Sequence, residues 1–500
     1  MRTAVAPAPQ RVAWRPSPYL LVATLAVAFA VALSVRQPWG ADFGLHAAVV
    51  GRLRDNLVDP GNPMVDATGT NPYFTPYPVV LALIARVTGL SAAAVLSAAA
   101  PVNLALLLWG LRRFVGLFTA SRWAPLLALA FVPLLWGPSA PRWSGFPTLT
   151  GLPLILPYPS TIALALTLLA WTLFAGALDT GSRGRWAGAG VLGGLIVLIH
   201  PFTAVCAAIG ALALAAGRLR RGLDPRGPLI GVAVLAVLVL TWPYFRVTDL
   251  AAAAGELNAI HEALFVDPLR RYGLAFLVGL PALYLRVRRD RFDPLVLLFA
   301  FSAGPVLVGW ATGNYALGRI WPLVLLALQV AAAVELARLL SPPRALGLAW
   351  AALALGACIG GLTMQYGNLL LALPPDQLTV TRRQAHDITS STDWSWVADV
   401  TGRGAVVATD NTGAGRALLA DEVRFVAPPW PDPLLPDEDQ RRADLAELLA
   451  ADTPAPRRLE LLRRYDVTWV LDTRGSFTWA DPLSTEVVDG RGMARLLRVG

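Results

Sequence analysis

Apolar runs, separated by short segments rich in arginine and proline, fill the chain as far as about residue 371. An α-helix needs roughly 20 mostly apolar residues to cross a bilayer. The pattern therefore predicts an α-helical polytopic membrane protein. We expect about eleven transmembrane helices, near residues 19–35, 92–111, 123–138, 159–177, 186–200, 202–217, 228–246, 272–286, 293–311, 320–338 and 345–371.

The apolar segment 75–90 is interpreted differently, because it has only about fifteen residues and carries Arg86. If it crossed the membrane, the arginines at 112, 113 and 122 would lie outside, against the positive-inside rule. We expect a juxtamembrane or re-entrant helix instead. With that choice, the arginine clusters at 183–185, 218–226, 286–291 and 338–344 fall on the cytoplasmic side.

Three arginines precede the first span, so we expect the N-terminus on the cytoplasmic side of a bacterial plasma membrane. Residues 38–91 then form an external first loop, and an odd number of spans leaves the C-terminus outside. From about residue 374 charges and prolines increase. We therefore divide the chain into a transmembrane domain, 1–373, and a small α/β extracytoplasmic domain, 374–500. In the second domain we predict strands at 405–410, 423–428 and 467–472 and helices at 441–450 and 456–465.

Composition supports the membrane assignment, since 55% of the residues are hydrophobic and only 15% are charged. The net charge of +9 comes from arginines between apolar runs, so it indicates orientation and no nucleic-acid partner. Cys206 and Cys358 lie inside apolar runs without CxxC or Cys/His spacing, which indicates neither a disulfide framework nor a zinc site. The sequence requires no cofactor; a divalent metal is compatible with it but unsupported.

Ionisable residues collect on the expected outer side, and Asp42 and His46 come first. In a helix over 42–57 they lie four residues apart over the first turn, above an apolar stripe that would run along the membrane surface: Leu45, Val49, Leu53 and Leu57. One interpretation is that Asp42 caps the helix and His46 is solvated. The functional interpretation makes Asp42 a general base, with His46 tuning it or binding phosphate.

The remainder of the first loop and one later loop supply further candidates. Asp66 is either a second carboxylate or a turn residue, and Tyr73 and Tyr77 indicate an ordered loop that could contact an acceptor. His261 and Glu262 lie in a predicted short helix that could cover the site as a lid. The HE pair lacks the second histidine of HExxH, so zinc is not indicated.

Three further residues stand at external ends of spans and could bind a lipid phosphate. His200 lies within an apolar run directly before Pro201, where an ionisable side chain is costly. Arg319 and Arg142 could each grip a phosphate. The alternatives are a histidine hydrogen-bonded to a neighbouring helix and arginines that snorkel to head groups.

Three stretches carry a resemblance to a known family: WGADFGLH at 39–46, NPYFTPYP at 71–78 and RRLELLRRYDVTWVLD at 457–472. Together with the predicted topology, they make most of the chain resemble the GT-C superfamily of membrane glycosyltransferases. The closest similarity is to actinobacterial arabinofuranosyl- and mannosyltransferases, which use polyprenyl-phosphate sugars as donors.

The resemblance implies an inverting transfer of a sugar to a glycan, lipid or protein acceptor of the cell envelope. Asp42 would occupy the place of the family's first-loop catalytic carboxylate, and Arg319, Arg142 or His200 would neutralise the departing phosphate. Many relatives have a carboxylate pair at this place, whereas Ala41 precedes Asp42 here. Asp66 could supply the second acid.

Two other classes of function remain open on the sequence. A transporter or flippase for lipid-linked sugars predicts two related halves with interrupted helices and charges near the membrane centre. Neither an inverted repeat nor many deep charges are evident. A non-catalytic protein of envelope assembly is favoured by the missing second acid.

Overall fold

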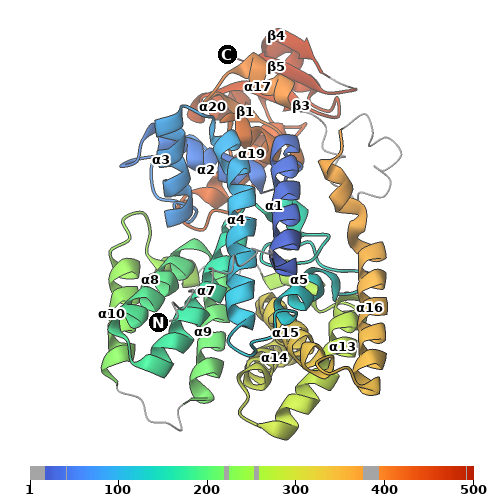
Figure 1. The fold of residues 1–500 in the computed structure, drawn as a ribbon. Helices are drawn as coiled ribbons and strands as arrows, with labels where there is room; N and C mark the ends of the chain where they lie inside the picture. Colours follow the sequence, from blue (N-terminus) through green and yellow to red (C-terminus); the bar gives the residue numbers. More distant parts are fainter. Residues whose placement is uncertain are drawn as a thin grey trace, which may run out of the picture.

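The computed structural model describes residues 17–40, 42–218, 225–252, 258–374, 394–490 and 492–499. A bundle of long helices forms the larger part, and strands from the C-terminal end of the chain lie at one end of it (Figure 1). The N-terminal arginines used for the orientation, and Ala41, lie outside the described residues.

Each predicted transmembrane segment corresponds to a helix. These helices are α1 (Pro18–Arg36), α4 (Ala92–Val115), α5 (Ala124–Leu134), α7 (Pro159–Thr180), α8 (Arg183–Ile199), α9 (Pro201–Ala216), α10 (Arg226–Leu240), α13 (Pro268–Arg289), α14 (Pro294–Thr312), α15 (Trp321–Leu339) and α16 (Ala345–Gln365). In the described part of the chain, six helical segments are long and apolar enough to cross a membrane by themselves. The number of crossings therefore stays a prediction.

Helix α5 differs most from its predicted bounds. It has 11 residues and ends at Leu134, directly after Pro133, instead of continuing to residue 138. Proline removes a backbone donor and clashes with the preceding turn, which explains an early end. The chain after α5 folds over the bundle as a loop, residues 135–151, and this loop lines part of the site.

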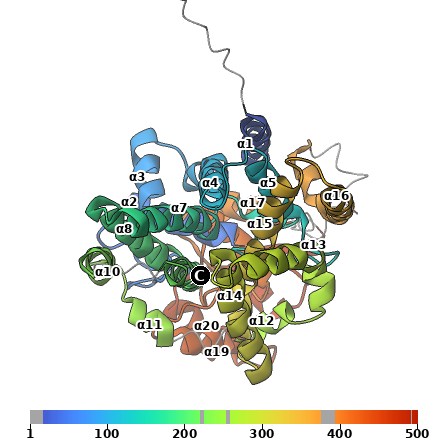
Figure 2. The same cartoon turned by 60° about the horizontal axis from the view of Figure 1, so that its bottom comes forward.

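Helix α15 is the central helix of the bundle. Its residues from Leu323 to Ala337 are all buried. Seen from the end of the bundle, α5, α13 and α14 surround α15, whereas α1, α10 and α16 lie at the periphery (Figure 2).

Two short helices, α2 (Phe43–Asp55) and α3 (Pro76–Thr88), form most of the first loop. The predicted apolar stripe of α2 does not run along the membrane surface. Leu45, Val49 and Leu53 are buried in a core that α2 shares with α3, α4 and the C-terminal residues. The stripe is apolar because protein covers it, and the surface interpretation was wrong on this point.

The C-terminal α/β segment, residues 394–499, contains a five-stranded sheet in the order β2-β1-β3-β5-β4. Its strands are β1 (Val406–Ala408), β2 (Arg424–Phe425), β3 (Val467–Asp472), β4 (Ser484–Asp489) and β5 (Arg495–Val499). The first three pair in parallel, and β5 and β4 extend the sheet antiparallel. Its helices are α17 (Ser395–Thr401), α18 (Thr412–Leu418), α19 (Glu438–Leu449) and α20 (Ala455–Arg464).

The first loop and the C-terminal α/β segment are joined by polar contacts. Val65 forms an isolated parallel bridge with Phe425 of β2. The side-chain amides of Asn62 and Asn71 each donate to the same carboxylate oxygen of Asp432 at 2.7 Å. The C-terminal α/β segment is thereby held directly over α2, where Asp42 lies.

Candidate functional site

Asp42 is the residue before the first turn of α2, yet its side chain makes no capping hydrogen bond within the described chain. Its backbone dihedrals (φ −80°, ψ −7°) are helical, whereas a capping residue is usually extended. The geometry thus argues against the capping interpretation. The carboxylate lies at the positive end of the α2 dipole, where an anion is favoured, and is left available to a ligand.

Arg416, on α18 of the C-terminal α/β segment, acts electrostatically on Asp42 from above. The backbone of α18 touches α2 so closely that a Cβ on Gly44 would lie 2.0 Å from the Arg416 carbonyl oxygen. The guanidinium stacks 3.5 Å from the ring centre of Trp430, and its Nε donates to the Pro429 carbonyl at 3.2 Å. These contacts hold a positive charge over the first turn of α2.

Burial raises the pKa of Asp42 above its ordinary value, and the positive charges of Arg416 and Arg319 oppose the increase. A carboxylate with a raised pKa is a better proton acceptor than one in water. A nearby positive charge favours the ionised form of a carboxylate, which is the form that can accept a proton.

Arg319 lies in a short 3-10 helix, η4 (Tyr315–Ile320), directly before α15. The side chain is buried, and aromatic rings face its guanidinium carbon from three sides: Phe202 at 4.9 Å, Trp143 at 5.6 Å and Phe146 at 5.8 Å. In the described chain no carboxylate lies within ion-pair distance of it. A buried cation of this kind is costly unless an anion compensates it, and bidentate binding of phosphate would do so.

The loop after α5 brings three polar side chains together around Gly145. This residue has φ +84°, a conformation that favours glycine. A Cβ built there would lie 3.9 Å from Cε1 of His200 and 4.0 Å from both Nη2 of Arg319 and Cβ of Ser160. The Ser160 hydroxyl is buried without a hydrogen-bond partner among the described residues. It is a further group that a ligand could satisfy.

His200 ends α8 and caps α9. Its Nδ1 accepts from the backbone N–H of Thr203 at 3.3 Å and lies 2.8 Å from the Thr203 hydroxyl. The capping bond assigns the proton to Nε2, because Nδ1 is the acceptor. A neutral His200 can therefore donate from Nε2 toward a phosphate oxygen.

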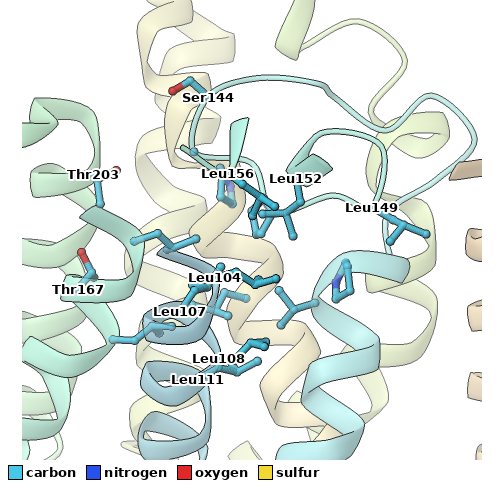
Figure 3. Close-up of a pocket in the computed structure, with 18 of the residues that line it drawn as sticks. Leu104, Leu107, Leu108, Leu111, Ser144, Leu149, Leu152, Leu156, Thr167 and Thr203 are labelled. Atoms are coloured by element: carbon cyan, nitrogen blue, oxygen red, sulfur yellow. The ribbon is translucent and has the colours of Figure 1, made fainter. Parts of the chain in front are cut away.

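A cavity of about 350 Å³ opens beside Arg319, His200 and Thr203. Its walls are almost entirely apolar. Leu104, Leu107, Leu108 and Leu111 of α4 point into it, and Thr203 and Ser144 lie at its upper part (Figure 3). The cavity thus combines an apolar lining with the buried cation of Arg319.

His46 lies one turn into α2 between two tyrosine rings, with ring centres 5.0 Å from Tyr158 and 5.7 Å from Tyr73. Burial lowers the pKa of His46 to about 4. The imidazole is therefore neutral at pH 7 and carries no charge to neutralise a phosphate. Tyr158 donates to the Gly40 carbonyl at 2.8 Å, which fixes the backbone two residues before Asp42.

Four other predicted site residues lie apart from this cluster. The Asp66 carboxylate forms an ion pair with Arg424 on β2, which makes it a link to the C-terminal α/β segment. Arg142 and Glu262 are exposed. The Tyr77 hydroxyl is held by Asn103 at 2.8 Å and by the Pro157 carbonyl at 2.7 Å, in a structural role.

His261 is closer to the site than Glu262. Its buried ring packs 5.1 Å from Trp143 and 5.5 Å from Phe202, the rings that face Arg319. The short helix α12 (Asn258–His261) continues into η3 (Glu262–Leu264), as the pattern predicts, although residues 253–257 of the predicted helix lie outside the described chain. His261 thus packs against two of the aromatic rings that surround the Arg319 guanidinium.

Sequence reasoning missed Arg416, Ser160, Tyr158 and the aromatic rings around Arg319. Arg416 has no local signal, because only the packing of α18 on α2 places it near Asp42. In the described residues no group of three or more His, Cys, Asp or Glu side chains is arranged to hold a metal ion.

The fold is similar to those of two solved structures, the arabinofuranosyltransferase AftD and ArnT, and the apolar helices of the described residues are those of a multi-pass membrane protein. The cryo-EM structure of the arabinofuranosyltransferase AftD from mycobacteria matches 96% of this chain with a TM-score of 0.57 at 17% identity. A mutant of AftD, R1389S, matches with a TM-score of 0.58 at 16% identity. This chain spans about two fifths of AftD, since 40% of that chain is covered.

The crystal structure of ArnT from Cupriavidus metallidurans in the apo state matches along nearly the full length of both chains. The match covers 96% of this chain and 97% of ArnT, with a TM-score of 0.55 at 15% identity. No protein-family model matches the chain, and no curated protein matches it either.

Proposed function

We propose that this protein transfers a sugar from a polyprenyl-phosphate donor to an acceptor of the cell envelope, on the extracytoplasmic face of the bacterial plasma membrane. The observation that carries the proposal is that Asp42, a carboxylate without a capping hydrogen bond, feels the positive charge of Arg319, a buried cation among aromatic rings that lines an apolar cavity. The fold shared with GT-C glycosyltransferases supports the same class of reaction.

The donor fits the cavity by chemistry. The isoprenoid chain would occupy the leucine-lined interior, where burial of apolar surface is favourable. The phosphate would lie against the Arg319 guanidinium and the Nε2 proton of His200, with the Ser160 hydroxyl near by. The sugar would then extend toward α2 and the C-terminal α/β segment.

The reaction is an inverting displacement. The Asp42 carboxylate accepts the proton of an acceptor hydroxyl, whose oxygen forms a bond to the anomeric carbon. The bond from that carbon to the donor phosphate oxygen breaks at the same time, and its electron pair leaves with the polyprenyl phosphate. Arg319 stabilises the charge that develops on the leaving group. Mannose and arabinofuranose donors are the first to test, and the C-terminal α/β segment is the proposed acceptor-binding part.

The deciding experiment is Asp42→Asn, assayed as transfer of radiolabelled sugar from polyprenyl-phosphate arabinofuranose and polyprenyl-phosphate mannose in membranes. Asp55→Asn is the matched control, because it removes a carboxylate from the exposed end of the same helix. We expect transfer to be lost in Asp42→Asn and kept in the control, at equal protein levels. Unchanged transfer in Asp42→Asn would exclude Asp42 as the base.

Absence of transfer by the unaltered protein with either donor would instead favour the transporter or scaffold classes. Flipping of a labelled lipid-linked sugar in proteoliposomes then separates those two, because a transporter moves the lipid and a scaffold does not.

A further inference from the structure

A second cavity, of about 630 Å³, lies between the loop after α4 and the last turns of α13 and α15. The last turns of these helices lie at the end of the bundle remote from the C-terminal strands (Figure 1). We refer to it as the basic end pocket, and its charged lining residues are Arg122, Arg286, Arg289, Glu335 and Arg338. In the expected orientation this end of the bundle faces the cytoplasm.

Glu335 organises the arginines of the basic end pocket. It is 1% exposed on α15, a helix that is apolar except for Gln329, Glu335 and Arg338. One carboxylate oxygen pairs with Arg286 at 3.0 Å, and the other pairs with Arg289 and, at 3.6 Å, with Arg338. An isolated buried carboxylate would be very costly, so the ion pairs explain how Glu335 is tolerated. Their effect is to hold three guanidinium groups at one cavity wall.

Positive charge exceeds negative charge in this pocket. Arg286 also forms a bidentate pair with Asp293, with N–O distances of 2.6 and 2.9 Å. Arg122 also lines the pocket, and its guanidinium carbon lies 5.2 Å from the ring centre of Trp123. Four arginines therefore share two carboxylates among the pairs that the structure describes here. The net positive charge of the pocket would attract an anion.

The remaining lining suits the phosphate of a lipid head group. Thr119, Ser121 and Ser341 contribute hydroxyl groups, and Phe118 and Val334 provide apolar wall. Trp123 is 43% exposed at the rim, where tryptophan is favoured at a membrane interface. Basic pockets between helices on the cytoplasmic side are a known way of binding anionic head groups. Guanidinium groups bind phosphate oxygens in bidentate fashion.

We propose that the basic end pocket binds a phosphate group, carried by an anionic phospholipid whose acyl chains lie against the bundle. The proposal is separate from the proposed glycosyl transfer, because it concerns the opposite end of the helices. The plain alternative is that these arginines only set topology, as arginines in cytoplasmic loops do. Arg288 and Arg291, which are exposed at the same end and do not line the pocket, supply the comparison.

The test measures lipid binding to the purified full-length protein by native mass spectrometry. The probes are dioctanoyl phosphatidylglycerol, dioctanoyl phosphatidylcholine and inorganic phosphate. Arg122→Ser combined with Arg338→Ser removes two pocket charges, and Arg288→Ser combined with Arg291→Ser is the matched control. With a loss of about fivefold per arginine, we expect phosphatidylglycerol affinity to fall about 25-fold in the pocket variant and to stay unchanged in the control.

Equal losses in both double variants, or equal binding of phosphatidylcholine and phosphatidylglycerol, would overturn the proposal. Competition by inorganic phosphate at millimolar concentration, without detectable lipid binding, would overturn the lipid source and assign the pocket to free phosphate. If the pocket variant fails to fold, Arg122→Lys with Arg338→Lys keeps the charges and removes the bidentate geometry. Undiminished phosphatidylglycerol binding by that variant would also count against the proposal.

Discussion

Gly44→Ala tests whether the C-terminal α/β segment presses on the first turn of α2 and so positions the charge over Asp42. The added methyl group would lie 2.0 Å from the Arg416 carbonyl oxygen and 3.3 Å from that of Ala417. Neither neighbour is a flexible side-chain end, so backbone must move. Helix α18 has to retreat by more than an ångström to restore an ordinary contact.

The expected magnitude follows from that displacement. Overpacking of this kind costs about 1–3 kcal/mol, which makes local opening of the α2–α18 contact about 5- to 150-fold more frequent. A displacement of about 1 Å at a catalytic centre can lower a rate about 100-fold. We therefore expect sugar transfer to fall by about one to two orders of magnitude while the helical bundle remains folded.

Two measurements check this expectation. Hydrogen exchange followed by mass spectrometry reports the α2 and α18 backbones directly and is independent of the donor sugar. Transfer activity reports the consequence. The control is Gly273→Ala on α13, because a Cβ there meets nothing within 4 Å. If Gly44→Ala shows the exchange rates and activity of the control, then α18 does not press on α2 as described and the placement of Arg416 is refuted.

Three further predictions concern charge and the C-terminal contacts. In Arg416→Ala, the pKa of Asp42 rises further because a positive charge is removed, so the acidic limb of the pH–rate profile should move to higher pH; an unmoved limb contradicts the coupling. Asn71→Ala removes one of the two amide donors to Asp432 and should destabilise the contact between first loop and C-terminal α/β segment by about 1–3 kcal/mol, measured as faster exchange there. Burial alone would raise the pKa of Asp472, but hydrogen bonds from the backbone N–H groups of Phe477, Arg474 and Ser476 and from the Arg495 side chain leave this pKa lowered. The ionised Asp472 therefore stabilises the folded state fully above about pH 4, and this stabilisation is lost as pH falls through the folded-state pKa. Asp472→Ala should make thermal unfolding less dependent on acid pH.

The helices were predictable from the sequence because each is a continuous apolar run bounded by charges or proline. Helix α7 is an example, since it was expected at 159–177 and extends from Pro159 to Thr180. The same local reasoning predicted β3 with its observed bounds, Val467–Asp472, since four of its six residues are apolar and all but Thr468 are buried. Strand β4 was not predicted, because it lies largely exposed and has mixed polarity.

The candidate site was predictable only where chemistry is visible within a few residues. Asp42, His46, His200 and Arg319 could be selected because each is an ionisable side chain beside an apolar run, where it is costly. Arg416 could not, because its role depends on contact with a helix more than 360 residues earlier in the chain. The stripe on α2 was assigned to the membrane for a related reason, since periodicity reports that a face is covered without reporting what covers it.

The same physical reasoning separates the two arginine sites of this protein. Arg319 is caged by aromatic rings and has no carboxylate within ion-pair distance among the described residues, so its charge is left for a ligand at the apolar cavity. The arginines around Glu335 are partly neutralised and keep an excess charge at the other end of the bundle. A buried cation without an ion-pair partner is stabilised by an anion bound at one defined position. A partly exposed cluster of arginines that share carboxylates binds an anion more weakly, so that the anion exchanges with solvent. Variants of Arg319 should therefore abolish transfer, and variants of the basic end pocket should change lipid binding while transfer persists.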